Sequence, residues 1–443
     1  MAPAWPYPTI APEMQRAGDP QKGYGALINN GYVSCGLPWS LYSQFFSPAP
    51  ANLQLPGRTG HNQTLPYYET AFTTSSGVEV VAPNCLLCHA AQLNNQLIIG
   101  LGAHNQDFTT DQSQYIDAAG ALINDPNDKA EWQKFAQRMD AIGPYTITAT
   151  RGVNPADNLA AVLFAHRDQQ TLAWSETPLI DLPPKVVVPV DVPPWWRMSR
   201  KAAMFYDAAG RGDHARIMMT ASTLCTDSVA EAQAIDSYFN DIRAYIYSLT
   251  PPAYPYPIDS QLAARGKVVF DNNCSQCHGT YGSNSVYPNE VIPIEAVGTD
   301  SELVVGATQF ADRFVHWFNG SFYGQTAHLD PQPGLIAPPL DGIWATAPYL
   351  HNGSVPTLAA LLDSSQRPQY WTRNFDDTTA YDSTAVGWKF TPLAHGQSAE
   401  PIAANRPLIY DTTQSGYSNQ GHTFADPLSK DDRTALLEYL KTL

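Results

Sequence analysis

Two segments of the chain carry apolar residues at the spacing of an amphipathic helix. In the stretch 228–249 the apolar positions are Val229, Ile235, Phe239, Ile242, Ile246 and Leu249, which places them on one helix face. The C-terminal run opens with a capping box, in which Ser429 is followed at the third position by Asp432. It continues through Leu436, Leu437, Tyr439, Leu440 and Leu443. Because the two runs end in similar sequences, we expect the same closing helix to occur twice.

A proline-rich segment separates the two halves of the chain. Residues 250–257 read Thr-Pro-Pro-Ala-Tyr-Pro-Tyr-Pro, which cannot continue a helix. After it, Asp259 or Ser260 caps a short predicted helix that covers residues 261–270. We therefore expect a domain boundary near residue 250, with one domain in residues 1–250 and a second in residues 251–443.

The composition excludes several classes of protein. The 443 residues contain 25 Lys and Arg against 41 Asp and Glu, a formal net charge of −16, which argues against a nucleic-acid partner. Hydrophobic residues make up 44% and aromatic residues 11%, too many for a disordered chain. No apolar run approaches the roughly 20 residues of a membrane span. The 37 prolines indicate many fixed loops.

Four of the six cysteines form two identical motifs. Both Cys85-Leu86-Leu87-Cys88-His89 and Cys274-Ser275-Gln276-Cys277-His278 read C-x-x-C-H, the attachment signature of a c-type haem. The thiols of such a motif bind the macrocycle covalently, and the adjacent histidine ligates the iron. The alternatives are one zinc site built from all four cysteines, which leaves the histidines unexplained, or two redox-active pairs. We interpret the motifs as two covalent haems.

The two haem motifs define the expected fold and compartment. A helix before C-x-x-C-H and a helix at the domain end are typical of cytochrome c. We expect a mostly α protein with two cytochrome c-like haem domains, little β structure, and long irregular loops at 50–84 and 366–427 that wrap the haems.

Covalent haem attachment in bacteria takes place outside the cytoplasm. The chain begins Met-Ala-Pro-Ala-Trp-Pro, without the basic and apolar regions of a signal peptide. We therefore expect a periplasmic or secreted protein whose Met1 was added to the mature form. In that compartment Cys35 and Cys225 form either a disulfide or two separate buried thiols.

The second half resembles a known family. The stretch from Ala337 to Leu358, which contains Gly-Ile-Trp-Ala-Thr-Ala-Pro-Tyr-Leu-His-Asn-Gly-Ser-Val-Pro, resembles the second-domain signature of the bacterial dihaem cytochrome c peroxidase superfamily. It is closest to the rubber-oxygenase branch, as is Asn419-Gln420-Gly421-His422. The resemblance implies one six-coordinate haem that transfers electrons and one haem with an open or openable iron site.

The resemblance also implies ligands for the second haem. The methionine that ligates the electron-transfer haem in the peroxidases has no counterpart, because Ser365 stands at the matching position. Rubber-oxygenase-like members use a histidine that matches His422, so we expect His278 and His422 to ligate the second haem. His351 is the competing candidate, for which the resemblance implies a place beside the haem. The alternative for either residue is a core histidine whose hydrogen bonds are satisfied within the protein.

For the first haem, the resemblance implies residues on the far side of the iron and between the haems. His104 follows His89 at nearly the separation of the displaceable distal histidine of the peroxidases. The alternative is a loop histidine bonded to Asp107. Trp195 or Trp196 matches the tryptophan that carries electrons between the haems, although a tryptophan pair is more often simply core.

Distal chemistry is expected from the stretch 205–219. Asp213 and His214 are candidates to move a proton, with Arg211 or Arg216 stabilising negative charge or pairing with haem propionates. Met218 and Met219 are expected to pack rather than to ligate. The resemblance further implies a calcium ion between the domains, held by backbone oxygens at Thr346 and Pro348.

The sequence is compatible with two functions. The first is an oxidoreductase that activates O2 or H2O2 at the first haem, with electrons stored at the second haem. Its partner would be a small redox protein or a small-molecule oxidant or substrate. The second is a non-catalytic dihaem electron carrier, whose acidic surface would steer it to a basic partner.

Overall fold

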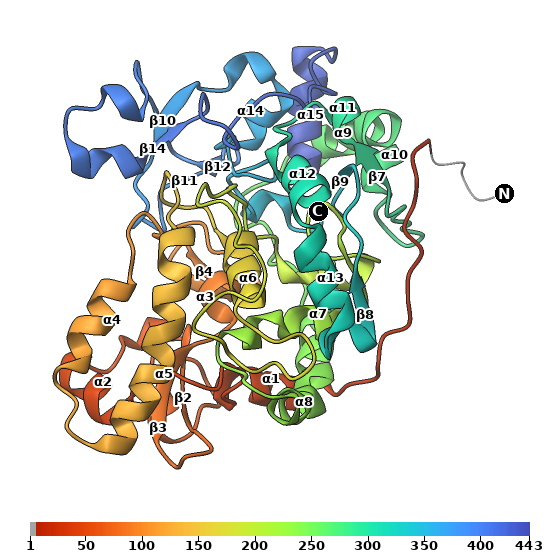
Figure 1. Cartoon of the computed structure of the whole chain (residues 1–443). Coiled ribbons are helices and arrows are strands. Elements are labelled where there is room, and N and C mark those ends of the chain that lie inside the picture. The colour runs from red at the N-terminus through yellow and green to blue at the C-terminus, as the bar shows by residue number, and fades with distance from the viewer. Residues whose placement is uncertain (1–5) are drawn as a thin grey trace.

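The computed structural model describes residues 6–443, so residues 1–5, with the Met1 interpreted as an added start residue, lie outside it. Helices dominate the fold (Figure 1). Their bounds are α1 Pro20–Asn29, α2 Trp39–Phe45, α3 Leu86–His89, α4 Ser113–Gly120, α5 Pro126–Ile142, α6 Ala156–Ala165, α7 His214–Met218, α8 Val229–Ser248, α9 Ser260–Asn273, α10 Ser275–His278, α11 Ile294–Val297, α12 Glu302–Val305, α13 Asp312–Gly320, α14 Leu358–Leu362 and α15 Lys430–Leu440. Among the described residues, none of these helices has the length and apolar character that spanning a membrane requires.

The strands are short and form small antiparallel sheets. Two sheets have three strands, in the orders β1-β3-β2 and β13-β10-β14, and the others pair β4 with β5, β6 with β8, β7 with β9, and β11 with β12. Their bounds are β1 Leu37–Pro38, β2 Glu69–Thr73, β3 Glu79–Pro83, β4 Ala90–Leu93, β5 Gln96–Ile99, β6 Gly210–Gly212, β7 Val291–Pro293, β8 Ala327–Leu329, β9 Gly334–Ile336, β10 Tyr370–Thr372, β11 Tyr381–Asp382, β12 Gly387–Trp388, β13 Thr391–Pro392 and β14 Ile409–Asp411.

The three helices predicted from the sequence are confirmed. The Ser228 hydroxyl caps α8 by accepting from the Glu231 N–H at 3.2 Å, and Asp259 is the residue that caps α9. At α15 the capping box forms as predicted, because the Ser429 hydroxyl accepts from the Asp432 N–H at 3.1 Å.

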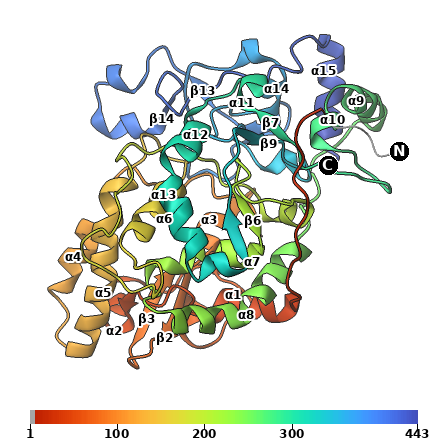
Figure 2. The same ribbon diagram turned by 45° about the vertical axis from the view of Figure 1, so that its right-hand side comes forward.

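Two pairs of packed helices lie at opposite ends of the molecule (Figures 1 and 2). In the second half, α9 packs on α15, and a side chain at Gly266 of α9 would collide with the Ala435 carbonyl of α15. In the first half, α1 packs on α8 in the same way, with Gly23 against the Asp241 carbonyl. Each pair therefore approaches closely because a glycine lies at the crossing. The second pair is the arrangement expected from the sequence, whereas α1 was not predicted.

The regions predicted as long irregular loops are mostly irregular but also contain short strands. Within 50–84, β2 and β3 pair with Ala71 opposite Val81, and within 366–427, β10 lies between β13 and β14. Only Pro83, Asn84, His422 and Phe424 of these two regions line the large cavity described below. The regions therefore pack mainly against protein.

The two halves share their cores across residue 250. The first core, built around α1, α6 and α8, includes Phe314, Trp317 and Phe318 of α13. The second core, built around α9 and α15, includes Leu93 and Trp196 from the first half. The domain boundary near residue 250 stays a prediction, and the proline segment there joins two halves that pack on each other.

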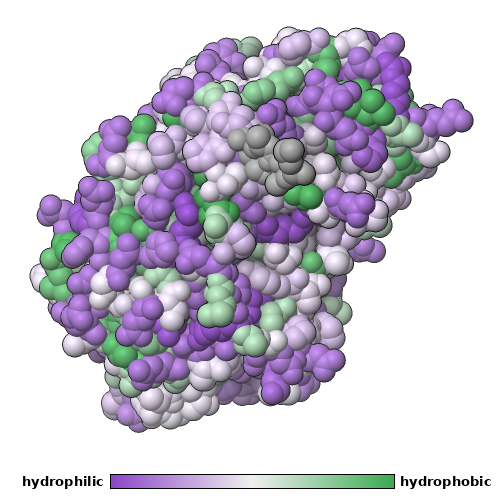
Figure 3. Space-filling view, turned by 90° about the vertical axis from the view of Figure 1, so that its right-hand side faces the viewer, coloured by the Kyte–Doolittle hydropathy of each residue, from purple (hydrophilic) through white to green (hydrophobic). Residues whose placement is uncertain are grey.

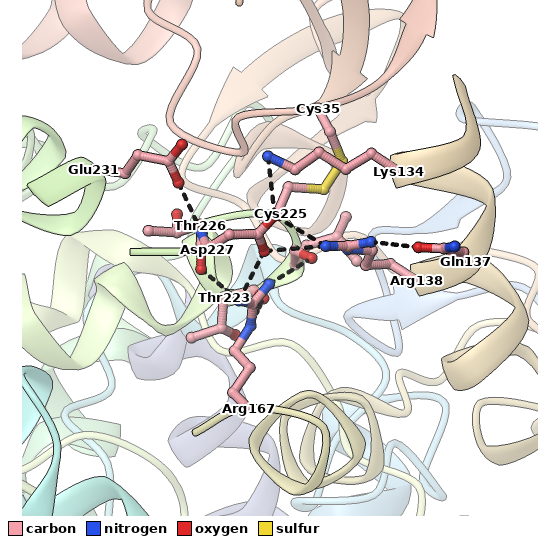
Figure 4. Close-up of a disulfide and its surroundings, with 11 residues drawn as sticks. Cys35, Lys134, Gln137, Arg138, Arg167, Thr223, Cys225, Thr226, Asp227 and Glu231 are labelled. Carbon is pink, nitrogen blue, oxygen red and sulfur yellow. Dashed lines mark hydrogen bonds and ion pairs between the residues drawn. A yellow bond between two sulfur atoms is a disulfide. The ribbon is translucent and has the colours of Figure 1, made fainter. Parts of the chain in front are cut away.

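A disulfide and a buried arginine fix the loop that precedes α8 (Figure 4). Cys35 and Cys225 are bridged and both are fully buried, so the disulfide alternative is the one the structure contains. Beside it, the Arg167 guanidinium donates to the carbonyls of Leu172 at 2.8 Å and Leu224 at 3.0 Å. Arg167 also pairs with Asp227 at 3.0 Å. These contacts satisfy a charge that burial would otherwise make costly.

Loss of the disulfide is expected to destabilise the fold without removing the haem motifs. The bridge closes a loop of 190 residues, so the double variant Cys35→Ser/Cys225→Ser should lose about 2–5 kcal/mol of unfolding free energy. Denaturant titration of the wild type and of the variant measures this difference. Equal midpoints, together with two reactive thiols in the denatured, unreduced wild type, would contradict the bridge.

Candidate functional site

One large cavity lies between the two halves of the molecule. Its volume is about 1240 Å³, more than the roughly 300–1,000 Å³ typical of a pocket for one small ligand. Its wall is mostly apolar and includes the cysteines and histidines of both motifs, namely Cys85, Cys88, His89, Cys274, Cys277 and His278. A cavity of this size and lining suits two large apolar ligands.

The first motif enters the cavity wall from a short helix between two strands. Helix α3 ends at His89, and the backbone then continues into the β4–β5 hairpin. At the Cys88 sulfur, the side-chain amides of Asn154 and Gln106 approach to 3.4 and 3.5 Å. These amides also bond to each other at 2.9 Å, so the orientation of the sulfur is fixed.

The Trp195-Trp196 pair connects the first motif to the second core. The Trp195 ring stacks on His89, with ring centroids 4.7 Å apart and planes 20° apart. Trp196 points the other way, where its indole N–H donates to the Asp341 carbonyl at 2.8 Å. Of the two, Trp195 lines the cavity, whereas Trp196 is packed in the second core. The pair therefore connects the ring of His89 to the second core.

The second motif is held by a backbone carbonyl. Helix α10 ends at His278, whose Nδ1 lies 2.8 Å from the Pro338 carbonyl oxygen. A bond of this kind fixes the tautomer and leaves Nε2 free for a metal.

A close backbone approach delivers His422 to the same place. A side chain at Gly421 would collide with the backbone of Gly298, and the His422 N–H donates to the Val297 carbonyl at 2.7 Å. The Arg367 guanidinium donates to the carbonyl oxygens of Asn419 and Gly421, both at 2.7 Å. His422 itself has a φ of 46°, which is rare for a residue other than glycine. Backbone strain of this kind is concentrated at functional sites.

The His278 and His422 rings face each other at a separation that suits iron. Their centroids are 6.1 Å apart. Two metal–nitrogen bonds of about 2 Å each, plus the imidazole radii, would place the centroids roughly 6 Å apart. The His422 Nδ1 atom is buried without a hydrogen-bond partner, and burial lowers the pKa of this imidazole to about 4. The residues present therefore fit a haem iron with two neutral imidazole ligands.

His351 lies elsewhere in the cavity wall. Its ring is 6.3 Å from the ring of Tyr206, and both of its nitrogens are buried without a partner. Its carbonyl accepts from the Asp191 N–H at 2.7 Å. This position favours His422 over His351 as the residue opposite His278, and it leaves His351 as a neutral side chain that faces the cavity.

The structure does not bring His104 to the cavity. Its ring packs 4.3 Å from Trp388, and its carbonyl accepts from Arg373. His104 is buried and is not among the residues that line the cavity. This placement does not support a distal ligand, which stays a prediction, and the alternative bond to Asp107 does not form, since that carboxylate accepts from Thr109.

Of the expected distal group, only His214 lines the cavity. Asp213 caps α7 and pairs with Arg16, Arg211 lies 3.7 Å from Asp330, and Arg216 pairs with Asp236 at 2.9 Å. These three side chains are engaged in ion pairs and do not line the cavity, and the roles suggested for them at the iron stay predictions. The His214 Nδ1 bonds the Tyr247 hydroxyl at 2.6 Å, and its Nε2 is buried without a partner.

The predicted stretch reaches the cavity through different residues. Phe205 and Ala208 both have positive φ values, of 68° and 57°, and the tight loop that they form places Tyr206 and Asp207 in the cavity wall. The Tyr206 hydroxyl donates to Asp191 at 3.4 Å. Burial, and then the charge of Asp157, raises the pKa of Asp207 to about 7. The sequence carried one signal that this loop contributes to the site, because Asp207 lies inside the stretch 205–219, from which distal chemistry was expected.

The alternative readings of the cysteines do not fit the geometry. Across residues 6–443, no three or more His, Cys, Asp or Glu side chains come together in a group that could hold a metal ion. Cys85, Cys88, Cys274 and Cys277 are unbridged. Burial raises the pKa of Cys85 to about 11 and that of Cys274 to about 12. One zinc site built from all four cysteines is therefore excluded, and the thiols lack the thiolate character of a reactive pair.

Comparison with known proteins shows that a short part of the chain is similar to a family. Residues 334–372 match the model of a family described as RoxA-like, cytochrome c-like. The matched segment contains Pro338, whose carbonyl accepts a hydrogen bond from His278. It also contains Arg367, whose guanidinium donates to the Asn419 carbonyl shortly before His422. This segment is therefore cytochrome c-like and implies covalently bound haem, whereas the wider dihaem peroxidase resemblance stays a prediction.

Two proteins of Sinorhizobium fredii are similar to the chain over longer stretches. The protein y4iM is 26% identical over 62% of this chain and 69% of its own length. The protein y4iJ is 30% identical over 44% of this chain and 41% of its own length. Both are described as uncharacterized, so they support common ancestry and add no activity.

The facing imidazoles predict which histidine controls the spin state of the second haem. His422→Ala should convert that haem from low spin to high spin, because the imidazole opposite His278 is lost. His351→Ala is the matched control and should leave the low-spin signal unchanged. Low-temperature EPR of the oxidised variants measures both. A loss of the signal in His351→Ala, with His422→Ala unchanged, would contradict the assignment.

Proposed function

We propose that the chain is an exported c-type cytochrome with two covalent haems, and that it works as an oxidoreductase. In this proposal the first haem is bound by Cys85 and Cys88 and reacts with O2 or H2O2. The second haem is bound by Cys274 and Cys277, has His278 and His422 as ligands, and stores electrons. The shared cavity and the cytochrome c-like match at residues 334–372 support it.

The asymmetry of the two histidine settings is the observation that carries the proposal. His278 has a second imidazole 6.1 Å away, whereas the ring against His89 is the indole of Trp195. Within the described part of the chain, no imidazole stands opposite His89 in the way that His422 stands opposite His278. An iron held by one protein ligand can bind a small molecule at its other face. Such an open position supports a reaction rather than electron storage.

The side chains around the cavity would perform distinct tasks. A bound haem supplies the electron-transfer and oxygen chemistry. Trp195 and Trp196 provide an aromatic route between the two motifs. Asp207, whose pKa is raised to about 7, is able to hold or release a proton near neutral pH. Arg197 is buried in the cavity wall, where a cation would pair with haem propionates.

The surroundings of Thr346 and Pro348 do not favour the calcium ion that the resemblance implies. Thr346 and Pro348 both lie at the cavity. The Arg197 guanidinium, however, is 3.5 Å from the Thr346 hydroxyl oxygen, and a nearby positive charge disfavours a divalent cation. The proposed cofactors are the two haems alone.

Compartment and partner follow from the covalent chemistry and from the surface charge. The Cys35–Cys225 disulfide and the two C-x-x-C-H motifs support a periplasmic or secreted protein. The net charge of −16 suits a basic redox protein as electron donor or acceptor. A small-molecule oxidant or substrate would enter the cavity directly.

One observation favours the non-catalytic electron carrier as a second candidate. His214 lines the cavity, and its buried Nε2 has no partner. In this candidate function the Nε2 atom of His214 would act as a second ligand of the first haem. The first haem would then be closed, and the protein would only exchange electrons.

The open first site makes a spectroscopic prediction. In the fully oxidised or half-reduced protein, we expect a high-spin ferric EPR signal from one haem and a change of that signal on addition of cyanide. The half-reduced sample is included because a displaceable ligand can hide the site until one electron is taken up.

The variant His214→Ala separates the two candidate functions. If the protein is an enzyme, the wild type already shows the cyanide-sensitive signal and the variant keeps it. Two low-spin haems that ignore cyanide in the wild type in both states, with a high-spin signal appearing only in His214→Ala, would overturn the enzyme proposal in favour of the carrier.

A further inference from the structure

The N-terminal segment of the first half lies on the second half, beside the second haem motif. In Figures 1 and 2 it runs along the edge of the molecule toward α10. Thr9 forms an antiparallel bridge with Glu290, flanked by bonds of 2.9 Å from the Ile10 N–H to the Asn289 carbonyl and from the Val291 N–H to the Pro8 carbonyl. Pro6 and Tyr7 line the cavity. The surrounding face is mainly hydrophilic, with scattered hydrophobic residues (Figure 3).

This segment buries a carboxylate. Glu290 is 0% exposed, and its Oε1 accepts from the Tyr7 N–H at 3.3 Å. Its Oε2 is buried without a hydrogen-bond partner. No ion pair to Glu290 occurs in residues 6–443, although other buried carboxylates of the chain, such as Asp213, have an arginine partner. Burying a carboxylate without an ion-pair partner costs folding free energy, which suggests that Glu290 has a role other than stabilising the fold.

The neighbour of this carboxylate is a cysteine of the second haem motif. Burial, followed by the charge of Glu290, raises the pKa of the Cys277 thiol to about 11. The backbone also places Glu290 beside the second motif, because its carbonyl accepts from the Ala337 N–H at 3.2 Å, and the carbonyl of the next residue, Pro338, lies 2.8 Å from the His278 Nδ1. When the Cys277 sulfur is bonded to a haem it has no proton to donate, and the carboxylate then keeps only its bond from the Tyr7 N–H.

A charge of the other sign also lies near the second motif. The Arg197 guanidinium lies close enough to His278 to lower the pKa of that imidazole, after the larger effect of burial and against the bond to Pro338. Arg197 donates to the Asp341 carbonyl at 2.9 Å. The second motif therefore has both a buried cation and a buried anion near it. The anion is the one without a partner of its own.

We propose that Glu290 lowers the reduction potential of the second haem. The inference rests on the proposed attachment of a haem at Cys274 and Cys277. Reduction adds one electron from an external donor, and a fixed negative charge nearby disfavours that gain. The N-terminal segment strengthens the effect, because it keeps water away from the carboxylate and so keeps the local dielectric low. Glu290 is a positioning residue that acts through its charge and not through contact with a substrate.

The test is a potentiometric titration of the holoprotein, followed by the visible spectrum of the low-spin haem. Glu290→Gln removes the charge with little change of shape. It should raise the reduction equilibrium constant of the second haem by about tenfold, which corresponds to roughly 59 mV for one electron. Glu290→Asp keeps the charge and should keep the wild-type potential. Glu295→Gln removes the charge of an exposed glutamate on α11 and is the matched control.

A potential in Glu290→Gln that equals the wild type, or a shift that Glu295→Gln reproduces, would overturn the inference. If Glu290→Gln binds less haem than the wild type, Tyr7→Pro and Tyr7→Ala replace it. Both variants lose the tyrosine ring, but only proline removes the backbone N–H that donates to the Glu290 carboxylate. At a pH where the carboxylate is ionised, we expect a lower potential in the proline variant. Equal potentials in these two variants would also overturn the inference.

The same samples separate this inference from the proposed function. A protein with two covalent haems and no shift in these variants contradicts the role of Glu290 alone. A folded protein without a covalent haem at Cys274 and Cys277 contradicts both. The haem count from the pyridine haemochrome spectrum distinguishes the two results.

Discussion

Burial of two C-x-x-C-H motifs in the wall of one cavity is the constraint on which the rest of the structure depends. A cavity of about 1240 Å³ with a mostly apolar lining forfeits the packing contacts that its wall would otherwise make. The histidines in it are neutral, since burial lowers the pKa of His89, His351 and His422 to about 4. Two covalent haems would fill the space and use the unpartnered nitrogens.

The remainder of the fold holds that cavity in shape from both ends. The α1–α8 and α9–α15 pairs cross at Gly23 and Gly266, where the backbones come close enough to fix the angle of each pair. The disulfide and Arg167 fix the loop before α8. Across the middle, α13 packs into the first core and Trp196 into the second. Because the halves interlock, the two motifs are held at a fixed separation, on which electron transfer between two haems would depend.

Local signals allowed some elements to be predicted from the sequence. Helices α8, α9 and α15 have a capping residue and a clear apolar period, and both features are read within a few residues. Helix α1 carries a similar cap at Asp19 followed by Pro20, but its apolar face is short. The strands in 50–84 and 366–427 are two to five residues long, too short for alternation to distinguish them from loops.

The candidate site was predictable only where a motif carried it. The cysteines and their histidines follow from C-x-x-C-H, and His422 followed from a resemblance. Asp213 and Arg211 were chosen for their chemistry, yet ion pairs with Arg16 and Asp330 engage them elsewhere. Asp191 and Glu290 could not be found from the sequence, because each owes its setting to residues far away in the chain, such as His351 in the case of Asp191. The Glu290 partner Tyr7, for example, is 283 residues distant.

The haem content of the chain is the most direct test of whether both C-x-x-C-H motifs bind haem covalently. The chain would be exported in a host that matures c-type cytochromes, purified with its disulfide intact, and examined by intact-mass spectrometry after denaturation and by the pyridine haemochrome spectrum. We predict two covalent haems per chain, falling to one in the double variant Cys85→Ser/Cys88→Ser and to one in the double variant Cys274→Ser/Cys277→Ser. A folded wild-type protein whose four motif cysteines remain free thiols would contradict it.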